Sequence, residues 1–93
     1  MPYEVFEHIK GIQQAIPVGD KDKAWKHFYA VESSLDFDPN ASKYEKDCLQ
    51  RVNETLAEAL RQKMPMSVGP ALTGLQISLE RRTTGPDGWP LRR

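Results

Sequence analysis

The sequence predicts a small, mostly α-helical domain of the α+β class, with three helices followed by a C-terminal strand or β-hairpin. Apolar residues recur at steps of three and four through most of the chain, and they alternate with polar residues near its end. The length of 93 residues suits one small domain. We therefore expect a single domain over 1–93, with a helical part at 1–63, a connector at 64–74, and a strand or hairpin and basic tail at 75–93.

Apolar stripes predict the first two helices, at about residues 3–16 and 21–35. Pro17 should end the first helix, because the residue before a proline is disfavoured in the helical region. Asp20 is a suitable N-cap for the second helix. The stripes consist of Val5, Ile9, Ile12 and Ile16 in the first helix, and of Ala24, Phe28, Val31 and Leu35 in the second.

The third helix is expected at about residues 42–63, and it begins within the stretch DFDPNASKYEKD at 36–47. Oxygen-bearing residues at positions 1, 3 and 5 of this stretch are also typical of a calcium-binding loop. Ala41, however, occupies the sixth position, where such a loop needs glycine for its sharp turn. Ser42 and Glu45, three residues apart, match a helix-capping box. We therefore expect the start of a helix here and no metal site.

The C-terminal third of the chain shows a different pattern. Residues 64–74 are rich in proline and glycine, which indicates a connector. Residues 74–82 then place Leu75, Ile77 and Leu79 in alternation with polar residues, as in a half-buried strand. The turn-forming sequence TTGPDGW follows, so a second strand is expected at about residues 88–92. An isolated hairpin is marginal in water, and this one should pack on the helices or on a partner.

Two stretches around the second helix resemble the ends of the second helix of a tetratricopeptide repeat. They are GDKDKAW at 19–25 and SLDFDPNA at 34–41, and the resemblance spans residues 19–41, about a quarter of the chain. The resemblance implies packing of helices as hairpins and carries no functional assignment. The matching residues are Gly19, Ala24 and Phe28 at the front, and Leu35, Phe37, Asp38, Pro39 and Asn40 at the back.

The charge of the chain is distributed unevenly. Residues 1–60 contain seven basic and eleven acidic side chains, whereas residues 61–93 contain six basic and two acidic ones. A basic C-terminal segment favours contact with an acidic surface on a protein, on nucleic acid or on the chain's own helices. Guanidinium groups pair with phosphates and carboxylates, and an indole can stack on a base. The residues expected to contact a partner are Arg81, Arg82, Trp89, Leu91, Arg92 and Arg93.

Sequence motifs for catalysis and metal binding are missing. His8 and His27 lack the cysteine or HExxH spacing of zinc sites, and the glycines do not form a phosphate-binding loop. The single cysteine, Cys48, fits a reducing compartment and should be buried. No apolar run is long enough to span a bilayer. We therefore expect a cytoplasmic protein that is not an enzyme and that has no cofactor, metal, membrane contact or small-molecule substrate.

These features favour a non-enzymatic binding protein that docks on a larger protein or ribonucleoprotein assembly, as an inhibitor, adaptor or assembly subunit. Small phage-encoded inhibitors such as anti-CRISPR proteins resemble it in size and in their lack of catalytic motifs, and this resemblance implies inhibition by docking. The alternative is a nucleic-acid-associated protein that binds through the basic C-terminal segment. The two hypotheses differ in their dependence on salt, which is steep for contacts with phosphates.

Overall fold

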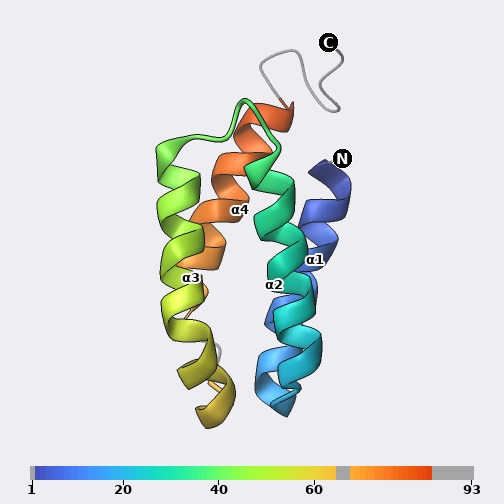
Figure 1. Ribbon diagram of the computed structural model, residues 1–93, viewed down its shortest axis with the longest axis vertical. Coiled ribbons are helices and arrows are strands. Elements are labelled where there is room, and N and C mark those ends of the chain that lie inside the picture. The colour runs from blue at the N-terminus through green and yellow to red at the C-terminus, as the bar shows by residue number, and fades with distance from the viewer. Residues whose placement is uncertain (1, 65–67, 85–93) are drawn as a thin grey trace.

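The computed structural model describes residues 2–64 and 68–84. Consecutive helices run antiparallel, so the described chain forms two helical hairpins that lie side by side (Figure 1). Within the hairpins α1 packs mainly on α2, and α3 mainly on α4. This is the kind of packing that the resemblance to a tetratricopeptide repeat implies. The four helices are α1 (Pro2–Val18), α2 (Lys21–Asp36), α3 (Lys43–Gln62) and α4 (Gly69–Thr84).

The predicted C-terminal strand, and with it the α+β class, is wrong. Residues 74–82 belong to α4, and the described part of the chain contains helices and no strand. Leu75 and Leu79 are buried one helical turn apart, whereas Ile77 between them is 43% exposed. Their alternation is therefore part of a longer stripe with the three- and four-residue spacing of a helix. The second predicted strand, at 88–92, lies outside the described residues. The buried α4 stripe consists of Val68, which directly precedes the helix, and of Ala71, Leu72, Leu75 and Leu79 within it.

Helix α4 begins at Gly69, inside the segment predicted to be a connector. Pro70 is compatible with this start, because an amide in the first turn of a helix has no intrahelical acceptor. Gly74 lowers the stability of an isolated helix by about 1 kcal/mol relative to alanine. A Cβ atom at this position would lie 2.5 Å from the hydroxyl oxygen of Tyr44 on α3. The glycine therefore leaves room for the hydroxyl group of Tyr44 against α4.

The end of α1 also differs from the prediction. The helix includes Pro17 and ends at Val18, two residues later than expected. Since Pro17 lies in the last turn, its missing N–H and the crowding by its ring disturb little of the helix. Gly19 then adopts the left-handed conformation with φ of 70°, and its amide and that of Asp20 donate to carbonyls of the last turn at 3.0 Å each. This Schellman geometry ends α1 and turns the chain directly into α2.

Both predicted N-caps are confirmed. The side chain of Asp20 accepts a hydrogen bond from the amide of Lys23 at 3.1 Å and so caps α2. Ser42 and Glu45 form a complete capping box at the start of α3, with hydrogen bonds of 3.1 and 3.2 Å. The other end of α3 is closed by Lys63, a non-glycine residue in the left-handed region with φ of 57°.

The stripes predicted for the first two helices supply eight of the twenty residues in the buried core of the described chain. All eight of their side chains are at most 2% exposed. Leu49, Val52, Leu56, Ala59 and Leu60 of α3 complete the core with the α4 stripe, and Cys48 lies at its edge. The four helices thus share one continuous interior, which holds the exposed side chains of each helix in fixed relative positions.

Candidate functional site

The predicted contact residues lie at or beyond the C-terminal end of α4. Arg81 is exposed there, and Arg82 follows it within the same helix. Trp89, Leu91, Arg92 and Arg93 lie outside the described residues. Arg81 is therefore the predicted residue from which the site is built.

Arg81 borders a hollow of about 340 Å³ between α3 and α4. Its other lining residues are Tyr44 from the first turn of α3 and Gly74, Ile77 and Ser78 from α4. The start of α3 meets the second half of α4 because the two helices are antiparallel (Figure 1). Tyr44 is 57% exposed and Ile77 is 43% exposed. We call Tyr44, Ile77 and Arg81 the Tyr44 surface.

A buried carboxylate lies beside this surface and joins its two helices. Glu45 is fully buried, and one of its oxygens accepts the amide hydrogen of Ser42 in the capping box. Its other oxygen accepts a hydrogen bond of 2.6 Å from the hydroxyl of Ser78 on α4. Hydrogen bonds to a charged group are stronger than neutral ones, and burial requires them. The contact holds the start of α3 against α4, which carries the rest of the Tyr44 surface.

The hydroxyl of Tyr44 is directed over α4 and toward its own helix. Its side-chain hydrogen bond with Cys48 is the largest of the influences that raise the pKa of Tyr44, followed by the charge of Cys48 and by burial. The positive charges of Arg51 and Arg81 act in the opposite direction. Tyr44 is therefore a neutral, partly exposed aromatic ring in a basic surrounding at physiological pH.

Sequence reasoning missed Tyr44, Ile77 and the bond between Glu45 and Ser78. Each depends on the packing of α3 on α4, which a C-terminal strand would not produce. A signal was nevertheless present, because Val68, Leu72, Leu75 and Leu79 follow one another at steps of 4, 3 and 4. This is the spacing by which the first helix was predicted.

Metal-binding clusters and membrane-spanning helices are absent from the described residues. No group of three or more histidine, cysteine, aspartate or glutamate side chains in these ranges is arranged to hold a metal ion. No helix in the same ranges has both the length and the apolar character needed to cross a membrane. No protein-family model matches the chain, and the searches of curated proteins and of solved structures found no match either.

Proposed function

We propose that this chain is a non-enzymatic binding protein that docks on a larger protein or ribonucleoprotein assembly as an inhibitor, adaptor or assembly subunit. The observation that supports the proposal is the exposure of an aromatic, an aliphatic and a guanidinium side chain around one hollow, at Tyr44, Ile77 and Arg81. Tyrosine and arginine are enriched among the residues that dominate binding energy at protein interfaces. The proposal also includes the basic residues that follow α4 in the sequence, Arg92 and Arg93.

The support beneath the Tyr44 surface favours docking as a preformed unit. Gly74 brings Tyr44 close to α4, and the bond between Ser78 and Glu45 joins the two helices below the surface. Side chains that are already positioned lose less conformational entropy on binding. We place the protein in the cytoplasm, because its single cysteine, Cys48, is a buried free thiol of the kind found in reducing compartments.

Affinity purification from the native cell, with tagged wild-type protein and surface variants, tests this proposal. The wild type should recover a partner in stoichiometric amount, and Tyr44→Ala and Arg81→Glu should each reduce this recovery at least about tenfold. Phe37→Ala is the control, because Phe37 is an aromatic side chain, 86% exposed, that lies outside the lining of this hollow. Recovery of no stoichiometric partner, or equal losses with Phe37→Ala, would contradict the proposal.

The alternative is binding of nucleic acid through the basic C-terminal segment. It is favoured by the exposed ring of Tyr44, which lies within the influence of Arg51 and Arg81 and resembles a platform for stacking a base. Removal of residues 85–93 leaves α4 intact, since this helix ends at Thr84. If the alternative holds, binding to RNA or DNA should weaken steeply with salt, and the truncation should weaken it further. Equal affinities of the truncated and complete chains would exclude it.

A further inference from the structure

A second hollow lies between α2 and α3, at the opposite end of the helices from the Tyr44 surface. It is formed where α2 begins and α3 ends, toward the bottom of Figure 1. Its volume is about 300 Å³, and its lining is mostly apolar with a basic rim. The apolar part consists of Trp25, Ala57 and Leu60, and the rim consists of Lys21, Arg61 and Lys63. We call it the Trp25 hollow.

The base of the Trp25 hollow is fixed by the core. The ring of Trp25 meets the buried ring of Phe28 edge-on, with centroids 5.5 Å apart and an angle of 84° between the planes. Leu60 is 2% exposed and belongs to the core of α3. The indole itself is only partly buried. An incoming side chain would therefore meet a rigid aromatic surface, as at the centre of many interfaces.

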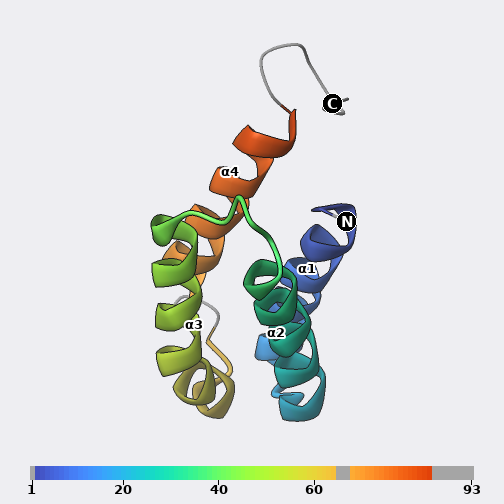
Figure 2. The ribbon, with the colours of Figure 1, turned by 45° about the horizontal axis from the view of Figure 1, so that its top comes forward.

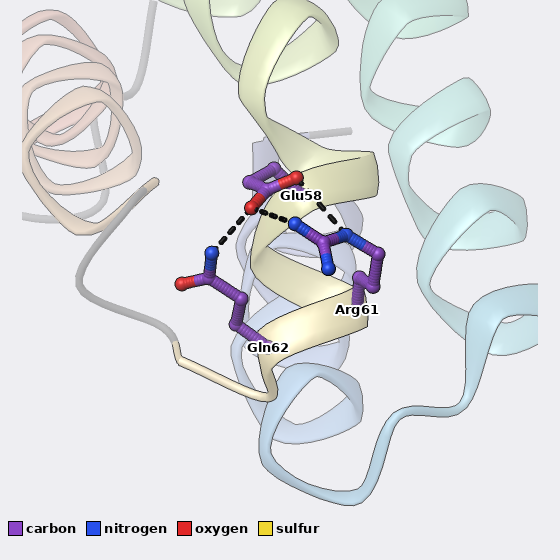
Figure 3. Close-up of polar contacts among 3 residues, drawn as sticks. All are labelled: Glu58, Arg61 and Gln62. Atoms are coloured by element: carbon purple, nitrogen blue, oxygen red, sulfur yellow. Dashed lines mark hydrogen bonds and ion pairs between the residues drawn. The ribbon is translucent and has the colours of Figure 1, made fainter.

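The three cations of the rim differ in how far they are neutralised. Arg61 donates two hydrogen bonds to the carboxylate of Glu58, which also accepts one from Gln62 (Figure 3). Lys21 and Lys63 are exposed, and neither forms an ion pair with a residue in the described ranges. Two exposed lysines without an ion pair in the described ranges thus flank an apolar hollow.

We propose that the Trp25 hollow binds an acidic peptide segment of a partner protein. An apolar side chain of the peptide packs against Trp25, and carboxylates beside it pair with Lys21 and Lys63. This combination matches both the apolar lining and the charge of the rim. A nucleic acid would satisfy the lysines but has no aliphatic side chain for the hollow. The proposal does not depend on the Tyr44 surface, which shares no residue with it.

Selection from a random peptide display library tests the proposal. The bait is the full chain carrying Trp89→Phe, so that Trp25 becomes the only tryptophan and reports binding by its fluorescence. Selected peptides should carry an apolar residue flanked by aspartate or glutamate. The double variant Lys21→Glu/Lys63→Glu should bind them at least about tenfold more weakly, because it places like charges opposite the carboxylates. Lys10→Glu/Lys26→Glu, two exposed lysines outside the hollow, should bind them as the wild type does.

Ala57→Glu is a second variant that places a negative charge in the lining without touching the rim lysines. It should weaken the same peptides, with an unfolding temperature measured in parallel to establish that the variant is folded. The proposal is overturned if no peptide is enriched, or if the selected peptides lack acidic residues. It is also overturned if these peptides bind the Lys21→Glu/Lys63→Glu variant as tightly as the wild type.

Discussion

His8 on α1 and His27 on α2 face each other with their Nδ1 atoms 2.8 Å apart. In this contact one Nδ1–H donates to the lone pair of the other Nδ1. The accepting Nδ1 carries no hydrogen, so at least one of the two imidazole rings is neutral. The ring centroids are 5.1 Å apart, which makes the pair a direct contact between the two helices of the first hairpin. If both rings are protonated, both nitrogens carry hydrogens and the contact becomes a repulsion between two cations.

This pair makes the stability of the first hairpin dependent on pH. Burial lowers the pKa of His27, and the charges of His8, Lys23 and Lys26 lower it further. The folded chain therefore binds a proton at His27 less readily than the unfolded chain, whose pKa is about 6.5. The neutral form of His27 therefore stabilises the folded chain fully at a pH above about 6.5, and this contribution declines as the pH falls below 6.5. The unfolding temperature should be lower at about pH 5.5 than at about pH 7.5. His27→Gln should flatten this dependence, and an unchanged pH profile in that variant would contradict the interpretation.

Gly11 provides the space that the imidazole ring of His27 occupies. A Cβ atom at this position would lie 2.4 Å from Cδ2 of His27. We expect Gly11→Ala to destabilise the protein by about 1–3 kcal/mol, although alanine favours helix, because the imidazole ring must leave its position. Urea unfolding measures the loss. In a His27→Ala background the same change should be neutral or stabilising, since the obstacle is then absent. A similar loss in both backgrounds would show that the ring is not the cause.

The bond between Ser78 and Glu45 can be tested by removing the donor. Ser78→Ala leaves an oxygen of a buried carboxylate without this hydrogen bond, and we expect a loss of about 1–3 kcal/mol in the free energy of unfolding. Thr73→Ala, at an exposed position of α4, should change it by less than about 0.5 kcal/mol. In a Glu45→Gln background the loss from Ser78→Ala should become smaller, because the acceptor is no longer charged. Equal losses in the two backgrounds would contradict the structure at this contact.

The first three helices could be predicted from the sequence because local signals agree there. Their apolar residues keep the helical spacing, and Asp20 and Ser42 provide caps where two of the helices begin. In α4 the local signals conflict. Pro70 and Gly74 are typical of a connector, and the alternation after them is typical of a strand. Packing against α3 stabilises the helix. Intrinsic secondary-structure propensity does not include such tertiary contacts, so it does not predict this helix.

The Tyr44 surface could be predicted only in part for the same reason. The charge of Arg81 is visible in the sequence and is enough to predict this residue as a contact. Tyr44 and Ile77 are 33 residues apart in the chain and meet only because α3 and α4 are antiparallel. Figure 2 shows the end of α4 beyond the N-terminal end of α3, with its last turns extending past the body of the two hairpins. No pattern within either segment alone indicates this arrangement.

The helical structure of α4 can be tested by three alanine substitutions, because the losses of stability expected from them differ between a strand and a helix. In a strand, Leu75, Ile77 and Leu79 would point to the same face, and alanine at any of them would cost a similar amount. In α4, Leu75 and Leu79 are at most 2% exposed, so Leu75→Ala and Leu79→Ala should each lower the free energy of unfolding by about 2–5 kcal/mol. Ile77→Ala should lower it by less than about 0.5 kcal/mol, because this side chain is 43% exposed. Urea unfolding of the three variants measures these differences. Equal losses in the free energy of unfolding at all three positions would indicate a strand and contradict the helix. If the Tyr44 surface binds a partner as proposed, the same Ile77→Ala variant should weaken that binding while the protein remains stable, because Ile77 belongs to the surface and not to the core.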